Sequence, residues 1–169
     1  LKRFLPPLPD LVWTDFAAIW EPFEAKRKAM LTQEGTVEKY LYFVLEGVQR
    51  AYFVGEDGRE ATLVFTYAPS FGGVADSFLL QQPSQYYYET LTPGSFLRCT
   101  FQQVDELMLR HHALERLIRQ LTNQALAGTL TRQIELQAFS AEARFRALLK
   151  RSPQLLQLVP HKYIASYLG

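Results

Sequence analysis

The chain has 169 residues, of which 48% are hydrophobic and 14% aromatic; this composition is typical of a folded protein with a sizeable core and excludes a disordered one. No apolar run approaches the length of a membrane span, and the opening LKRFLPPLPD lacks the apolar core of a secretory signal. A single cysteine, Cys99, excludes an internal disulfide and a multi-cysteine zinc or iron–sulfur site, so a cytoplasmic location fits best.

The net charge of +1 conceals an asymmetry between the two ends of the chain. From Arg132 onward there are six Lys/Arg and two acidic residues, a net charge of +4, whereas the first 131 residues carry twelve and fifteen, a net charge of −3. A basic end on an acidic body fits a polyanion-binding segment, because phosphate neutralisation dominates nucleic-acid affinity. A solvated helix face explains the same charges equally well, since six are few.

The first part of the chain predicts one helix and then a series of strands. Residues 10–27 have apolar residues at roughly helical spacing, with Pro22 near the end of the expected helix. From Ala29 the sequence becomes rich in aromatic and β-branched residues, which is typical of strands. YLYFVLEG and VQRAYFV are interpreted as adjacent strands with Gly47 at the corner, and Asp57-Gly58 predicts a hairpin turn. Further strands around QYYYETLT and SFLRCTF indicate a sandwich or barrel.

After Phe101 the pattern becomes helical. QQVDELMLRHH predicts a short helix, and residues 113–139 predict a helix of about seven turns, with no proline and one glycine. Within this long helix, five residues follow the spacing of a coiled-coil seam: Leu114, Ile118, Leu121, Ala125 and Gly128. We expect this seam to form the interface of a homodimer, with part of it packed on the chain's own β domain.

Two shorter helical segments close the chain. Ser140 is the expected N-cap of SAEARFRALLKR, which Ser152-Pro153 interrupts. VPHKYIASYLG then has a proline at the start of a helix and Gly169 where the first helix of a helix-turn-helix meets its turn.

This order of elements resembles the CRP/FNR superfamily of bacterial transcription regulators. The likeness is carried by Gly35 in TQEGT, YLYFVLEGVQRAYF with Gly47, EDGRE, SAEARFRALL and VPHKYIASYLG. It implies an α+β fold: an antiparallel β-roll or jelly roll of cyclic-nucleotide-binding type flanked by helices, a long C-terminal dimerisation helix and a winged helix-turn-helix. The implied units are residues 1–112 (N-terminal helix and β-roll), 113–139 (dimerisation helix) and 140–169 (the start of a winged helix-turn-helix, expected to be incomplete because the recognition helix is missing).

The resemblance also points to a sensor site. In the family's cyclic-nucleotide binders, a Gly-Glu turn and an Arg-Ser or Arg-Thr pair hold the ligand. Gly72, Gly73 and Val74 stand at the first position here, and Ser84 and Gln85 at the second, with no arginine nearby. A cyclic phosphate would lose a charge-assisted hydrogen bond of roughly 1.5–3 kcal/mol, so cyclic AMP is not the expected effector. These five residues form the candidate pocket for another, unidentified effector; the alternative is a pocket filled by side chains of the YYY run. No cofactor is predicted.

By the same resemblance, His161 and Lys162 begin the first DNA-binding helix and are candidate contacts to DNA phosphates. The expected function is that of a cytoplasmic, homodimeric transcription regulator that binds double-stranded DNA and no membrane. Changes in its β-rolls would shift the long helices and re-space the DNA-binding heads about a hinge near Phe139-Ser140. The alternative is a stand-alone cyclic-nucleotide-binding-like regulatory module that acts on a protein partner.

An enzyme is not expected. A cupin enzyme would need metal-binding histidines on its strands, and residues 30 to 101 contain none. The adjacent His111-His112 point to different faces of a helix and are a poor chelate, so no metal site is predicted, although one axial histidine is enough to hold a haem.

Overall fold

Two four-stranded antiparallel sheets form the centre of the computed structural model, which describes residues 1–169. The first sheet has the order β1 (Glu21–Ala25), β8 (Gly94–Thr100), β3 (Tyr40–Glu46) and β6 (Ser70–Gly72). The second has the order β2 (Met30–Thr32), β7 (Tyr87–Thr90), β4 (Val48–Val54) and β5 (Glu60–Tyr67). Together with the connections between them they form the β-roll (residues 21–100), so the expected antiparallel roll flanked by helices is confirmed.

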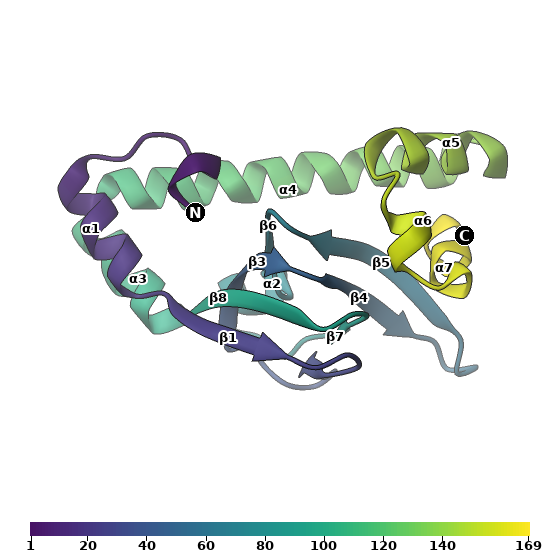
Figure 1. Cartoon of the computed structure of the whole chain (residues 1–169), viewed down its shortest axis with the longest axis horizontal. Coiled ribbons are helices and arrows are strands. Elements are labelled where there is room, and N and C mark those ends of the chain that lie inside the picture. The colour runs from purple at the N-terminus through teal and green to yellow at the C-terminus, as the bar shows by residue number, and fades with distance from the viewer.

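The helices lie around this roll. They are η1 (Lys2–Phe4), α1 (Asp10–Ala18), α2 (Ala75–Leu80), α3 (Phe101–Arg110), α4 (His112–Ala138), α5 (Ala141–Arg151), α6 (Leu155–Leu158) and α7 (His161–Leu168). Figure 1 shows α4 extending along the length of the molecule, with α1 and α3 at one end and α5, α6 and α7 at the other. No helix is both long enough and apolar enough to cross a bilayer.

Turn chemistry explains why the strands begin and end where they do. Gly47 joins β3 to β4 with φ +93°, and a Cβ there would lie 2.6 Å from the carbonyl oxygen of Pro93. Gly58, with φ +76°, occupies the turn between β4 and β5. Both conformations favour glycine, and both turns are where the sequence predicts them.

The predicted helix over residues 10–27 is wrong in its second half. The helix ends at Ala18, and Glu21–Ala25 form β1, in which Pro22 lies opposite Leu97 of β8. β1 is an edge strand, where a proline without an N–H is tolerated. The pairing with β8 therefore overrides the local helical spacing.

The later helices agree with the sequence to within a residue or two. α4 covers His112–Ala138, and Ser140 caps α5 by accepting a hydrogen bond from the Ala143 N–H at 3.2 Å. α5 ends at Arg151, directly before Ser152-Pro153.

Three clusters of buried apolar side chains hold these elements together. The first joins α1, α2 and α3 to the start of α4 around Phe16, Leu107 and Leu114. The second lies between the two sheets around Tyr42, Tyr88 and Phe96. The third lies between the second sheet and the C-terminal helices, and it leads to the candidate site.

Candidate functional site: the junction of the head and the β-roll

The C-terminal helices α5, α6 and α7 form a unit, the head (residues 140–169), that packs on the second sheet beside β5 (Figure 1). The apolar part of this contact is a cluster of eight buried residues: Val48, Phe65, Leu91, Leu148, Leu155, Val159, Tyr163 and Ile164. Three of them come from the roll and five from the head, so the two parts share one core.

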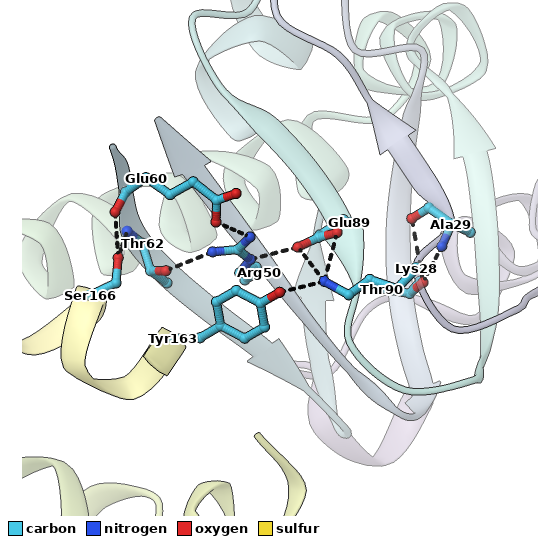
Figure 2. Close-up of polar contacts among 9 residues, drawn as sticks. All are labelled: Lys28, Ala29, Arg50, Glu60, Thr62, Glu89, Thr90, Tyr163 and Ser166. Atoms are coloured by element: carbon cyan, nitrogen blue, oxygen red, sulfur yellow. Dashed lines mark hydrogen bonds and ion pairs between the residues drawn. The ribbon is translucent and has the colours of Figure 1, made fainter. Parts of the chain in front are cut away.

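Arg50 of β4 lies at the centre of the polar part of the junction, with only 1% of its side chain exposed. Its Nε donates to Glu89 Oε1 at 2.7 Å, and its terminal nitrogens donate to Thr62 and Glu60, as Figure 2 shows. The ring of Tyr163 from the head lies 3.8 Å from the guanidinium carbon. A buried charge is stable only when it is paired and hydrogen-bonded, and Arg50 meets both conditions.

Tyr163 of α7 joins the head to a second cation of the roll. Its hydroxyl accepts a hydrogen bond from Lys28 Nζ at 2.6 Å, and the same Nζ pairs with Glu89 at 3.3 Å (Figure 2). Burial raises the pKa of the Tyr163 phenol, but the hydrogen bond from Lys28 and the charges of Lys28 and Arg50 outweigh it, so the pKa is lowered.

Ser166 binds the exposed edge of the second sheet. Its hydroxyl donates to the carbonyl oxygen of Glu60 at 2.7 Å and accepts from the Thr62 N–H at 2.9 Å. β5 is the last strand of its sheet, so these backbone groups have no neighbouring strand. The head therefore takes the place of a neighbouring strand at this point.

Glu135 holds the end of α4 to the head. Its carboxylate accepts from Arg132 of α4 at 2.9 Å and from Arg151 of α5 at 2.8 and 3.3 Å, and it is 4% exposed. Both arginines also reach α7, since Arg132 donates to the Tyr167 carbonyl and Arg151 to the Tyr167 hydroxyl. The hydrogen bond from Arg151 is the main cause that lowers the pKa of Glu135, and burial opposes it.

The junction is not evident from local sequence patterns, because its members lie far apart in the chain. One signal was available: Arg50 and Glu89 are opposite charges inside the otherwise apolar strands VQRAYFV and YYYET. A charge placed where it cannot reach water needs a partner, so the two could have been paired with each other.

The predicted DNA contacts are both exposed. His161 and Lys162 occupy the first turn of α7, and the Lys162 Nζ lies 4.8 Å from the centre of the Tyr163 ring. The exposed turn between β1 and β2, residues 26–28, has the sequence KRK. This turn lies next to the start of α7, because Arg27 and His161 line the same surface depression of about 560 Å³. Basic groups of the roll and of the head thus lie side by side.

Two of the predicted effector residues, Val74 and Ser84, make hydrogen bonds within the protein. The Val74 N–H donates to the buried carboxylate of Glu38 at 3.1 Å, and the Ser84 hydroxyl donates to the Tyr86 carbonyl at 2.7 Å. Tyr88, the last tyrosine of the YYY run, is fully buried, and a Cβ at Gly72 would lie 2.3 Å from its hydroxyl. Tyr88 therefore lies directly against Gly72.

The predicted seam of α4 divides into two parts. Leu114 and Ile118 are buried against α1 and α3 as part of the chain's own core, and Leu121 is half-buried. Ala125 and Gly128 are exposed, and a Cβ at Gly128 would meet nothing within 4 Å. Beyond this point α4 exposes Leu126 (58%), Leu130 (51%) and Ile134 (57%), and also Leu136 (43%).

Leu126, Leu130 and Ile134, hereafter the outer stripe, are spaced four apart and share one face of the helix. Leu130 is nine positions after Leu121, about two and a half turns, so the outer stripe lies opposite the predicted seam. The first half of the seam faces the protein's own core, whereas the outer stripe faces away from it.

The two-sheet roll is followed by a long helix and the helical head. The sequence matches the model of the family described as "Cyclic nucleotide-binding domain" over residues 22–111, and the chain belongs to this family. A search of curated proteins found no match.

Several solved structures share the fold. FixK2 from Bradyrhizobium japonicum has a TM-score of 0.79 at 17% identity, over 89% of this chain and 78% of that one. The Catabolite Activator Protein of Thermus thermophilus has a TM-score of 0.64 at 20% identity, over 94% and 76% of the two chains. CLP from Xanthomonas campestris, a c-di-GMP responsive global regulator, has a TM-score of 0.65 at 16% identity, over 90% and 74%. The resemblance to CRP/FNR regulators is thus confirmed in the fold.

Proposed function

We propose that the chain is a DNA-binding transcription regulator of the CRP/FNR type, which acts as a homodimer and whose effector is not cyclic AMP. The observation that carries this proposal is the head: a separate helical unit after the long helix, with an exposed basic turn at the start of α7 and the KRK turn of the roll beside it. Such a surface suits a DNA backbone, since phosphate contacts supply most of the sequence-independent affinity.

The proposed dimer contact is the exposed second half of α4. Leu126, Leu130 and Ile134 present an apolar face that the chain itself leaves uncovered, and burying it against a second copy removes that surface from water. Ala125 and Gly128, the small residues of the predicted seam, are exposed on the opposite side of α4. Leu114 and Ile118 are occupied by the core and are left out of the proposed interface.

The argument against cyclic AMP is the chemistry of residues 84 and 85. Ser84 is buried with its hydroxyl bonded to Tyr86, and neither Ser84 nor Gln85 offers a positive charge to a cyclic phosphate. A phosphate monoanion placed there would be desolvated without a cation.

DNA binding is tested with a fluorescently labelled duplex of random sequence, titrated by anisotropy at several salt concentrations. Lys162→Ala is expected to weaken binding to all sequences alike and to reduce the slope of log K against log salt by about 0.9. Lys2→Ala, in η1 next to the N-terminus and away from the head in Figure 1, is the matched control and is expected to leave the slope unchanged. Equal slopes for the parent chain and Lys162→Ala would remove this residue from the interface, and no salt-dependent binding at all would overturn the proposed function.

The dimer is tested by sedimentation velocity. Leu130→Glu places a charge on the outer stripe and is expected to weaken dimerisation at least about 100-fold, because an unpaired buried carboxylate costs several kcal/mol. Leu109→Glu, at an 80% exposed leucine of α3, is the control. A dimer that tolerates Leu130→Glu would show that another face is used.

A further inference from the structure

A second cavity opens in the roll, and no residue of the junction described above lines it. It has a volume of about 340 Å³ and is lined by residues of β1, β2, β3 and β8 and of the loop 33–39. This volume lies within the range of small-molecule sites, about 300–1,000 Å³. None of the predicted effector residues lines it. It borders the predicted effector residues, because Glu38 of its wall accepts a hydrogen bond from the Val74 N–H.

Tyr42 of β3 supplies an unused polar group in this cavity. The residue is 2% exposed, and no protein group hydrogen-bonds its hydroxyl. Only two side-chain polar atoms are fully enclosed without a hydrogen-bond partner, Trp20 Nε1 and Arg144 Nε. The Tyr42 oxygen also has no partner but is not among them, so it is accessible. The hydroxyl consequently faces the cavity. Burial and the neighbouring Glu38 carboxylate raise the pKa of this phenol, so at neutral pH it is a hydrogen-bond donor.

Arg98 of β8 supplies a cation in a fixed orientation. Its guanidinium carbon lies 4.2 Å from the centre of the Phe23 ring and 4.2 Å from that of Tyr40, so two aromatic rings hold it in place. Nε donates to Glu21 at 2.7 Å, and no protein acceptor binds the two terminal nitrogens. A planar guanidinium presented in this way matches the two oxygens of a carboxylate.

Glu38, the acidic residue of the cavity wall, has its oxygens occupied. Thr32 donates to Oε2, as does the Val74 N–H at 3.1 Å, and the Tyr40 N–H donates to Oε1 at 3.2 Å. Tyr42 and Arg98 therefore offer unused donors, the exposed Lys39 adds a second cation at the wall, and the side-chain amide of Gln33 can donate or accept. A dianion such as phosphate would meet repulsion from the buried Glu38, whereas a monoanion meets less.

We propose that this cavity binds a small aromatic carboxylate. The carboxylate accepts from the terminal nitrogens of Arg98 and from the Tyr42 hydroxyl, and the ring packs among Phe23, Leu31 and Tyr40. Binding at this site requires neither DNA nor a dimer, so it stands or falls separately from the proposed function.

The test is a titration of the isotope-labelled chain with benzoate, followed by ¹H–¹⁵N NMR. Saturable shifts are expected at the backbone amides of Tyr40, Tyr42 and Arg98, with a 1:1 stoichiometry. Benzamide, which has the same shape without the charge, is expected to bind at least about tenfold more weakly, since a hydrogen bond to a charged group is lost. Inorganic phosphate and cyclic AMP complete the panel of probes.

Two variants locate the site. Tyr42→Phe and Arg98→Gln are each expected to weaken benzoate binding about tenfold or more. Tyr87→Phe and Arg59→Gln change residues of the same types outside the cavity and are expected to bind as the parent chain does. The spectrum of each free variant reports whether it is folded, and Tyr42→Phe, which removes one atom, serves if Arg98→Gln does not fold.

The proposal is overturned if benzoate produces no saturable shift, or if benzamide or phosphate binds as tightly as benzoate. It is also overturned if Tyr42→Phe and Arg98→Gln bind benzoate unchanged, because the anion would then lie elsewhere. Shifts confined to Gly72 and Gly73 with cyclic AMP, and none with benzoate, would return the ligand site to the position that the family resemblance suggests.

Discussion

Replacing Glu135 by glutamine tests whether the head is held to the end of α4 by its buried carboxylate. The carboxylate accepts three hydrogen bonds, from Arg132 at 2.9 Å and from Arg151 at 2.8 and 3.3 Å. Glutamine has nearly the same shape, but its NH₂ group would face guanidinium donors, and its single oxygen carries no charge. The substitution therefore removes the anion without opening a cavity.

The expected loss of unfolding free energy follows from these contacts. Removing one partner of a buried ion pair costs about 3–5 kcal/mol. Arg151 is 44% exposed and can return to water, whereas Arg132 is 13% exposed and cannot do so fully. We therefore expect a loss of about 2–3 kcal/mol in Glu135→Gln, which for a chain of this size lowers Tm by about 5–10 °C.

The assay is urea unfolding at pH values from 3.5 to 8, with Glu142→Gln as the matched control. Glu142 pairs with Arg146 at 2.6 Å on the surface of α5, with both side chains more than 70% exposed, so its removal is expected to cost less than about 0.5 kcal/mol. The folded pKa of Glu135 is depressed below its ordinary value of 4.5, so its contribution is present above that pH and is lost as the pH falls through the folded pKa. The difference between the parent chain and Glu135→Gln should therefore shrink below pH 4.5. Equal stability of the two glutamine variants at neutral pH would refute the reasoning.

Three further substitutions probe the roll and the junction. Gly72→Ala places a Cβ 2.3 Å from the Tyr88 hydroxyl and is expected to cost about 1–3 kcal/mol in urea unfolding; adding Tyr88→Phe should recover part of the loss, and no recovery would place the strain elsewhere. Ser166→Ala should cost about 1 kcal/mol and speed hydrogen exchange at the Thr62 amide, and unchanged exchange there would contradict the contact at the sheet edge. Tyr163→Phe keeps the ring on Arg50 but loses the hydrogen bond at the phenol, so it should cost about 1 kcal/mol; stability equal to that of the parent chain would mean that this bond adds nothing.

Local sequence signals predicted most of the fold. The corner at Gly47 and the hairpin at Asp57-Gly58 need positive φ, and such positions can be recognised from sequence because glycine is favoured there. The helix predicted over residues 10–27 failed because Pro22 and its neighbours pair with β8, whose residues lie far along the chain. Spacing within a segment carries no information about such a partner.

The candidate site could be predicted only in part. His161 and Lys162 were predicted as DNA contacts from the family resemblance, and both are exposed. The seam of α4 was the harder case, because a stripe of apolar residues does not reveal whether it faces the chain's own core or a second copy. In the structure, Leu114 of the predicted seam is buried in the chain's own core, whereas Leu130, on the opposite side of α4, is exposed.

Neighbouring residues of β4 contact the inside of the roll and the head. Side chains alternate across a strand, so Ala51 points into the cluster between the two sheets while Arg50, its neighbour, lies under Tyr163 of α7. Both residues pair with residues of the neighbouring strand β7: Arg50 lies opposite Glu89, and Ala51 lies opposite the buried Tyr88. A shift of Tyr88 inside the roll therefore moves the strand that carries Glu89, and Glu89 holds both Arg50 and Lys28. The paired strands β4 and β7 thus form a continuous line of contacts from the inside of the roll to the head.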